Sequence, residues 1–467
     1  MFVKFRFRLL VVFVSFCFFS SNIVLAESSS WDHVDEILNR INEPVFKNTE
    51  YNITKYGAKT DGKLNTKAIQ KAIDVCHKKG GGKVIVPQGE FYTGPLTLKS
   101  NVNLHLEEGA VLKFSNNPDD YMQFVQTRWE GMDCINFHPL IYAYEQENIA
   151  VTGKGVLDGQ ADEESWWYMK GRDEYGWKEG LNSQEHGGGR DRLMQMVKDE
   201  VPVEKRIMTK DDCLRPQFIN PTKCKNVLID GVKIIRAPFW VIHPLFSTNV
   251  IVRGVSVKSH GPNNDGCDPE SCTDVLIEQC TFDTGDDCIA IKSGRNNDGR
   301  NSGKASENII VRDCNMKDGH GGVVIGSEIS AGCKNVFVEN CEMDSPNLDR
   351  VIRIKSNTVR GGEIENLYVR NIKVGQCKEA VFRVEFKYEK KDGKGPYFPA
   401  LKNVELKNVV CQKSKYGVFI EGIDEGIRVS DVKFVDCTFN NIEQTSRVTG
   451  AERIEFQNVN FMIDEVK

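Results

Sequence analysis

Residues 273–285, TDVLIEQCTFDTG, carry the pattern on which the fold prediction depends. An Asp opens a short run of alternating apolar residues, a polar residue and a cysteine follow, and a second short alternating run ends at a glycine. Apolar residues at every second position are typical of a β-strand with one buried face. Two such strands joined by a tight corner predict part of a coil that repeats along the chain.

The same pattern recurs over most of the chain. Clear copies begin at residues 147, 225, 248, 307, 334, 365 and 402, and weaker copies begin at 427 and 452. This predicts an all-β, single-domain, right-handed parallel β-helix; a propeller needs four strands per repeat, for which these spacings are too short, and a sandwich is the other competitor. Cys280, Cys314 and Cys341 share one repeat position, which indicates an internal stack of small side chains rather than metal ligands.

A helix is expected at the N-terminal end of the coils. Residues 65–79 have apolar side chains at positions 68, 69, 72, 73 and 76, which is a helical spacing. Strand-like segments without hairpin signals follow this helix, so we expect it to cap the first coil. We assign residues 27–467 to one domain with an insertion at about 160–224, which we expect to form a large loop or lid with a helical run up to Lys210.

Residues 1–26 resemble a secretory signal peptide. Lys4, Arg6 and Arg8 precede an apolar run at 9–19, and small residues end the segment. A membrane anchor is the alternative, but the run is short for a bilayer. We therefore expect a secreted protein, in the extracellular space or cell wall, or in the periplasm of a bacterium. The fifteen cysteines permit disulfides in that setting, although buried free thiols fit the repeats equally well.

The charge balance limits the class of partner. The chain has a net charge of −5 at pH 7, and cleavage at position 26 would remove three further positive charges. This argues against nucleic acid as a partner, whereas an anionic substrate would require cations gathered in its cleft. No Cys-x-x-Cys pair indicates a metal. We expect a monomer with no metal, no cofactor and no membrane association after cleavage.

Three aspartates could face one substrate. Asp265 and Asp286 are 21 residues apart, close to one coil, and Asp287 adjoins Asp286. Asp286 lies 12 residues after the Asp that opens its repeat, and His320 lies 12 residues after the Asn that opens the next one. Equal offsets place both at one angular position in successive coils. Asp286 and Asp287 can face the cleft together only at a strand end or a bulge, because strand neighbours point to opposite faces.

One coil further on, Arg353-Ile354-Lys355 should turn Ile354 inward and both cations outward. Taken singly, an Asp-Asp pair is most often a turn, a Gly-His-Gly a loop and an Arg-x-Lys a solvated strand. These three features and Asp265, in register on four successive coils, favour a single groove instead. Carboxylates paired across a groove can serve as acid and base in glycoside hydrolysis, and the cations can bind a sugar carboxylate.

These residues resemble the signature of glycoside hydrolase family 28, the polygalacturonases and their relatives. The family has Asn-Thr-Asp, Gly- or Gln-Asp-Asp, Gly-His-Gly and Arg-Ile-Lys in this order. Here the four motifs are Asn263-Asn264-Asp265, Gly285-Asp286-Asp287, Gly319-His320-Gly321 and Arg353-Ile354-Lys355. Asn264 stands where threonine is usual, which bears on substrate preference more than on activity, because the middle residue is not the catalytic one.

The resemblance implies roles for these side chains. Asp286 would be the general acid of an inverting hydrolysis, Asp265 and Asp287 would hold the attacking water as base, and His320 would support the protonation of the acid. Arg353 and Lys355 would bind galacturonate, and Asn263 is a further candidate for substrate binding.

We therefore expect hydrolysis of α-1,4-galacturonosyl bonds in pectin. We favour exo action, since the insertion at 160–224 could close one end of the groove. The alternatives are a hydrolase of rhamnogalacturonan or another substituted pectin, a pectate lyase, and a non-catalytic β-helix that binds polysaccharide. A lyase would need calcium and an arginine base, and a histidine among aspartates fits hydrolysis better.

Overall fold

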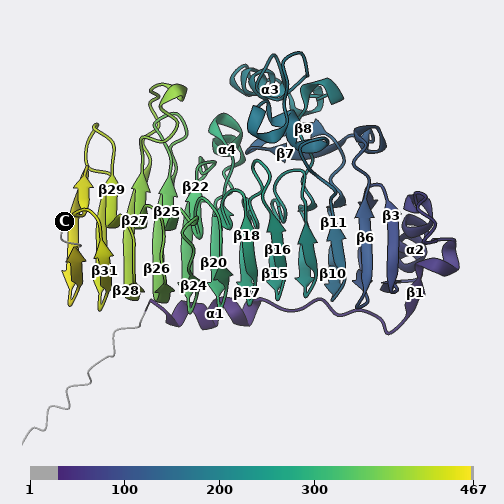
Figure 1. Ribbon diagram of the computed structural model, residues 1–467, viewed down its shortest axis with the longest axis horizontal. Coiled ribbons are helices and arrows are strands. Elements are labelled where there is room, and N and C mark those ends of the chain that lie inside the picture. The colour runs from purple at the N-terminus through teal and green to yellow at the C-terminus, as the bar shows by residue number, and fades with distance from the viewer. Residues whose placement is uncertain (1–29, 464–467) are drawn as a thin grey trace, which may run out of the picture.

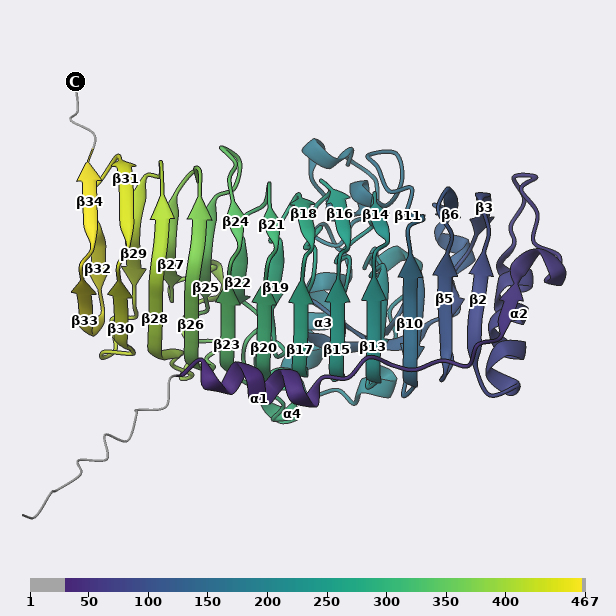
Figure 2. The same ribbon diagram turned by 90° about the horizontal axis from the view of Figure 1, so that it is seen from below.

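The computed structural model describes residues 30–463, so the expected signal peptide at 1–26 lies outside the described residues. The chain forms a right-handed parallel β-helix, as predicted, with its coils stacked side by side along the long axis (Figures 1 and 2). Among the described helices, none has the length and apolar character that crossing a bilayer would require.

Each coil contributes to three parallel stacks of strands. The first stack contains β1 (Glu50–Asn52), β2 (Gly82–Val86), β5 (Val102–Leu106), β10 (Glu147–Gly153), β13 (Lys225–Asp230), β15 (Thr248–Arg253), β17 (Thr273–Glu278), β20 (Ser306–Arg312), β23 (Cys333–Glu339), β26 (Glu363–Val374), β28 (Ala400–Cys411), β30 (Val429–Val435) and β33 (Ala451–Gln457). The second contains β3 (Gly89–Thr93), β6 (Ala110–Phe114), β11 (Val156–Asp158), β14 (Lys233–Ile235), β16 (Ser256–Ser259), β18 (Thr281–Thr284), β21 (Asn315–Met316), β24 (Glu342–Met343), the far halves of β26 and β28, β31 (Thr438–Ile442) and β34 (Asn460–Ile463).

The third stack carries the functional residues. It contains β4 (Leu96–Thr97), β9 (Ile141–Tyr144), β12 (Ile219–Thr222), β19 (Ile289–Ile291), β22 (Val323–Gly326), β25 (Arg350–Lys355), β27 (Ala380–Glu385), β29 (Tyr416–Glu421) and β32 (Arg447–Thr449). Single parallel bridges through Ile242 and Cys267 connect β12 to β19. The paired strands β7 (Val125–Trp129) and β8 (Met132–Asn136) are antiparallel and stand outside the coils.

The backbone conformation at the start of each repeat explains why an Asn or Asp stands there. Asn226, Asn249, Asp274, Asn308 and Asn335 all have positive φ, between 56° and 59°, a left-handed conformation that Asn and Asp tolerate best after glycine. Their side chains also bond from coil to coil: the amide of Asn308 donates to Asp274 at 2.9 Å, and that of Asn335 donates to Asn308 at 2.9 Å. The repeated polar residue therefore turns the chain and links neighbouring coils.

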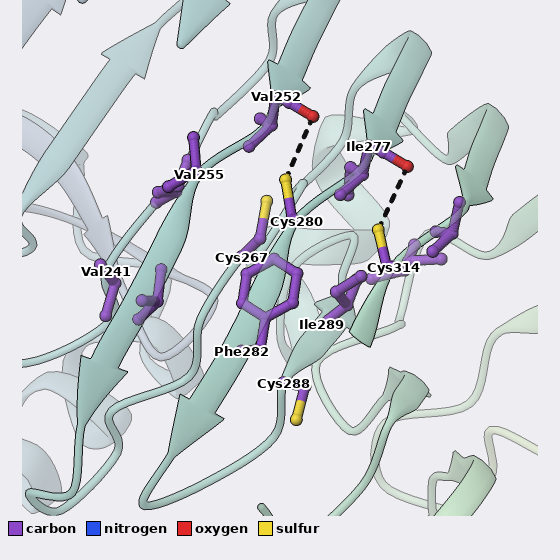
Figure 3. Close-up of a cluster of buried hydrophobic side chains, with 14 of the residues drawn as sticks. Val241, Val252, Val255, Cys267, Ile277, Cys280, Phe282, Cys288, Ile289 and Cys314 are labelled. Carbon is purple, nitrogen blue, oxygen red and sulfur yellow. Dashed lines mark hydrogen bonds between the residues drawn. The ribbon is translucent and has the colours of Figure 1, made fainter. Parts of the chain in front are cut away.

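The cysteines fill the interior of the coils. Cys280, Cys314 and Cys341 are buried at the same corner of successive coils, as their shared repeat position predicts. The thiol of Cys280 donates to the Val252 carbonyl at 3.5 Å, and that of Cys314 donates to the Ile277 carbonyl at 3.7 Å (Figure 3). All the cysteines within the described range are free and buried, so in this part of the chain they act as small core residues rather than as disulfide partners.

Two helices cover surfaces of the coils. Helix α2 (Thr66–Lys78) packs on β1, β2, β4 and β5 and lies at the N-terminal end of the stack, where a cap was expected (Figure 1). Helix α1 (Asp32–Arg40) lies instead along the outside of the first stack, where Val34 and Ile37 pack against Leu276, Ile310 and Phe337 (Figure 2).

The insertion leaves the coils between β11 and β12. It contains α3 (Gly189–Lys198), whose Leu193 packs with Trp129, Met132 and Phe239 in a small separate core over β7 and β8. The expectation of a helical run up to Lys210 is wrong. Helix α3 ends at Lys198, four residues before Pro202, which cannot donate a backbone hydrogen bond within a helix.

Candidate active site

Three aspartates meet on the outer face of the third stack. Asp286 and Asp287 lie in the turn between β18 and β19, where the strand alternation is interrupted, so both can face the same side. Asp265 belongs to the preceding coil, and the N–H of Gly266 donates to the carbonyl of Asp287 at 3.0 Å. One carboxylate oxygen from each of the three aspartates lies within 4.8 Å of the others. The structure therefore brings together the three residues that the spacing singled out.

His320 lies one coil beyond Asp286, as their equal offsets predicted. Its backbone N–H donates to the Asp286 carbonyl at 3.0 Å, and its Nδ1 lies 3.0 Å from Asp286 Oδ1. Gly319 allows this close approach: it has φ +152°, and a Cβ there would lie 2.6 Å from the Asp286 carbonyl oxygen. The Gly-His-Gly sequence thus seats the imidazole directly against one carboxylate.

Arg353 and Lys355 point outward from β25 while Ile354 is buried in the core, again as predicted. Lys355 Nζ lies 2.6 Å from Asp287 Oδ2, so this lysine holds one of the three aspartates. Arg353 donates to Glu385 Oε2 at 2.9 Å. Both cations line the cleft. Each is therefore already held by a protein carboxylate and presents its remaining N–H groups to a substrate.

Asn263 and Asn264 are adjacent in the chain but lie in different environments. Asn263 lines the cleft, and its Oδ1 accepts a hydrogen bond at 3.0 Å from Arg215, a fully buried arginine that also donates to the Pro262 and Pro238 carbonyls. Asn264 is buried and its Oδ1 accepts from the N–H of Gly261 at 2.9 Å. The residue that departs from the family pattern therefore shapes the turn and does not line the cleft.

The cleft has two walls that stand outside the coils, with a volume of about 220 Å³ between them. One wall comes from the insertion and carries Lys170, Arg172, Tyr175 and Arg190. The other comes from residues 386–399, between β27 and β28. Arg190 Nη2 approaches Glu389 of the second wall to 3.8 Å, so an ion pair joins the two walls. The part of the insertion that contains α3 stands outside the stacked coils, beside β7 and β8 (Figure 1).

Sequence reasoning missed three side chains at the floor of the cleft: Lys292, Glu328 and Trp240. Lys292 Nζ lies 3.4 Å from Asp265 Oδ2 and 3.3 Å from Glu328 Oε2, and 4.4 Å from the centre of the Trp240 ring. The alternation that located Arg353 and Lys355 could have found Lys292, because Ile289 and Ile291 point inward and the residue after them must point outward.

Burial and neighbouring charges set the resting protonation of the site. Desolvation and the adjacent Asp286 carboxylate raise the pKa of Asp265 to about 8. The Asp286 carboxylate raises the pKa of His320 to about 9, and the His320 imidazolium in turn lowers the pKa of Asp286. Below pH 8 the resting site therefore holds protons on Asp265 and His320 and leaves Asp286 ionised, opposite to the resting proton position expected of a general acid at Asp286.

The three aspartates also have the donor type that a hard cation would need. Two ammonium groups already contact them, since Lys355 bonds Asp287 and Lys292 pairs with Asp265. A divalent cation would be repelled by both ammonium groups, so the donor set fits a charge-paired carboxylate cluster better than a metal centre. The absence of a metal requirement stays a prediction.

A parallel β-helix that carries clustered carboxylates beside cationic walls has the groups that a glycosidase needs. The model of "Glycosyl hydrolases family 28" matches residues 204–413. The structure is similar to that of a hyperthermoactive exopolygalacturonase from Thermotoga maritima, with a TM-score of 0.89 and 41% identity over 93% of this chain and 96% of that one. The chain belongs to glycosyl hydrolase family 28, as its motifs predicted.

Two further relatives have names of the same kind. A probable polygalacturonase of Vitis vinifera is 27% identical over 403 residues, covering 81% of this chain and 73% of the relative. An exo-poly-alpha-D-galacturonosidase of Dickeya chrysanthemi is 30% identical over 396 residues, covering 78% of this chain and 62% of the relative.

Proposed function

We propose that this protein hydrolyses α-1,4-galacturonosyl linkages in pectin or polygalacturonate. The observation that carries the proposal is the cluster of Asp265, Asp286 and Asp287 on one face, with His320 bonded to Asp286 and cations on both sides. The polygalacturonases among its relatives support the same substrate class.

The reaction needs one group to protonate the leaving oxygen and another to activate water. The Asp286–His320 pair supplies the proton: the His320 imidazolium passes its proton to Asp286, which gives it to the glycosidic oxygen as the glycosidic bond breaks. Asp265, after it has released its resting proton to solvent, accepts the proton of the attacking water, and Asp287 helps to hold that water. The Oδ1 atoms of both are buried and have no hydrogen-bond partner among the described residues, so a water held between them would supply the missing hydrogen bonds.

The cations fit an anionic sugar. Arg353 can offer two parallel N–H groups to a galacturonate carboxylate, and Lys355 a single strong donor. Asn263 lines the same side of the cleft and is a substrate-binding candidate.

Exo action is the mode that the walls favour. The insertion carries Lys170, Arg172 and Arg190 into the cleft, and Arg190 reaches Glu389 in the opposite wall. A groove whose walls meet in this way would admit the end of a polysaccharide chain more easily than its middle. Products should then be short and uniform from the first minutes of reaction, whereas a rapid drop in viscosity with few reducing ends would overturn the exo assignment.

The test is incubation of the protein with polygalacturonate and a chelator, with products separated by chain length. The Asp286→Asn variant is the matched control, because it keeps the side-chain shape and removes the acid. Free galacturonate from the wild type and none from the variant would support the proposal. In a parallel incubation with calcium in place of the chelator, an unsaturated product absorbing in the ultraviolet would indicate a lyase.

No product from polygalacturonate would move the substrate to rhamnogalacturonan or another substituted pectin. Binding of both polymers without turnover would favour the non-catalytic alternative. We also propose that the protein is exported, because the basic and apolar segments at 1–26 fit a signal peptide, and that it acts as a monomer.

A further inference from the structure

Lys292 is a buried cation of the site, and neither the family motifs nor the proposed roles use it. Its side chain is 3% exposed, and it reaches the cleft floor from the residue after β19. Three carboxylates lie around its Nζ: Asp265 at 3.4 Å, Glu328 at 3.3 Å and Asp268 at 3.7 Å. A charge this buried is stable only because carboxylates surround it.

The position of the ammonium group is fixed on two sides. The Trp240 ring lies 4.4 Å from Nζ, within the range of a cation–π contact. Glu328 Oε1 lies 3.9 Å from the guanidinium groups of both Arg295 and Arg360, so these two arginines hold the carboxylate in place. Lys292 therefore keeps its place beside Asp265 whether or not a substrate is bound.

Asp268 lies behind this lysine and is fully buried. Its two carboxylate oxygens have no hydrogen-bond partner among the described residues, and Lys292 is its ion-pair partner there. Burial and the neighbouring Asp265 carboxylate raise the pKa of Asp268 well above its ordinary value. Asp265 and Glu328 lie closer to the Lys292 ammonium group than Asp268 does.

We propose that Lys292 is a positioning residue for the reaction, which acts through Asp265 by stabilising the ionised form of that carboxylate. The inference rests on the proposed hydrolysis. Of the other charged groups that act on Asp265, Asp286 and Asp287 oppose its ionisation, and Lys355 favours it while bonded to Asp287. Lys292 is the cation that contacts Asp265 directly.

The groups around Lys292 come from several elements. They include Asp265, Asp268, Asp287 and Glu328, together with His243, Glu270 and Arg128, which form a buried network beneath Trp240. Arg128 and Glu270 pair with one another at 3.0 Å and Glu270 accepts from His243, so this network is internally balanced and does not replace the charge of Lys292.

The test is the pH dependence of kcat/KM on polygalacturonate for Lys292→Met, Lys292→Arg and Asp268→Asn. Lys292→Met should move the limb governed by Asp265 to higher pH by about one unit or more, with kcat falling more than KM rises. Lys292→Arg keeps the charge and should restore the limb towards its wild-type position. Asp268→Asn keeps Lys292 and its contact with Asp265, so it should move the limb less than Lys292→Met does.

Lys258→Met is the matched control, because this lysine is exposed and pairs with Asp283 on the outer surface. It should leave the profile unchanged. A Lys292→Met protein that keeps the wild-type limb, or loses activity equally at every pH, would overturn the proposal.

A second readout does not depend on turnover. Carbon-13 labelling of the aspartate carboxyls allows Asp265 to be titrated by NMR, with Asp265→Asn identifying its signal. A higher Asp265 pKa in Lys292→Met supports the inference even if polygalacturonate proves the wrong substrate, and an unchanged pKa in a folded variant contradicts it.

Discussion

Asp286 and His320 are joined by two contacts across neighbouring coils, one from the backbone and one from the side chains, each 3.0 Å long. The backbone bond fixes the register of the two residues, and the side-chain contact lets one proton be shared between carboxylate and imidazole. The pair therefore behaves as one proton-holding unit, with the proton at rest on His320.

The Asp286–His320 pair predicts which variant regains activity on a substrate with a better leaving group. Asp286→Asn should lower kcat on polygalacturonate by about 10²–10⁴-fold, since proton transfer to the leaving oxygen is lost. An aryl galacturonide with an acidic phenol needs little protonation, so on that substrate Asp286→Asn should recover most of its activity. Asp265→Asn should not recover, because a water still has to be activated. If Asp265→Asn recovers and Asp286→Asn does not, the acid is Asp265, as the resting protonation of the site allows.

His320 predicts a loss of activity in alkaline solution. Its pKa of about 9 means that the imidazolium is present at neutral pH and is lost as pH rises through that value. The alkaline limb of kcat should therefore lie near pH 9, and His320→Gln should remove this limb and leave a slow, flatter profile. A limb that persists unchanged in His320→Gln would assign it to another group.

The same shifts predict how stability depends on pH. Folding raises the pKa of Asp265 from 3.8 to about 8 and that of His320 from 6.5 to about 9. The folded protein therefore binds more protons than the unfolded one between about pH 4 and 9, so these two groups lower Tm as pH rises through that window. Calorimetry of the wild type against Asp265→Asn should show a shallower decline for the variant.

The ion pair between the walls predicts a change in product pattern. Arg190→Met removes the contact with Glu389. We expect oligogalacturonates to appear among the products together with free galacturonate, because the closed end of the groove can then open. Arg172→Met is the matched control: Arg172 is half exposed and lies in the same wall, but it pairs with Glu174 and Glu185, which belong to the insertion itself. An unchanged product ladder for Arg190→Met would show that the closure does not depend on this pair.

The family resemblance and the distance between the carboxylates lead to different expectations for the stereochemistry of the product. The closest oxygens of Asp265 and Asp286 lie within 4.8 Å, whereas the carboxyl groups of most inverting glycosidases are about 6.5–9.5 Å apart. We expect inversion nonetheless, as the family resemblance implies, with Asp286 as the acid and with Asp265 and Asp287 holding the attacking water. Proton NMR of the first product anomer should show the β form, and an initial α product would contradict the prediction.

The coil pattern and the order of the motifs were readable from the chain alone. Alternating apolar residues set which side chains enter the core, so Ile354 is buried and Arg353 and Lys355 face out. Equal offsets from the opening Asn or Asp set the register of Asp286 and His320. Both properties follow from the two-residue period of a strand and from the stacking of coils, which are local and repeated.

The sequence by itself therefore determined the β-helix and the row of Asp265, Asp286, Asp287, His320, Arg353 and Lys355 along one face. Only the tertiary structure decided where the walls at 160–224 and 386–399 stand, because they leave the coils and no repeat fixes their path. It also decided that Lys292 contacts Asp265 and that the resting proton lies away from Asp286. Those properties depend on burial and on charges brought together from distant coils, which no spacing within the chain records.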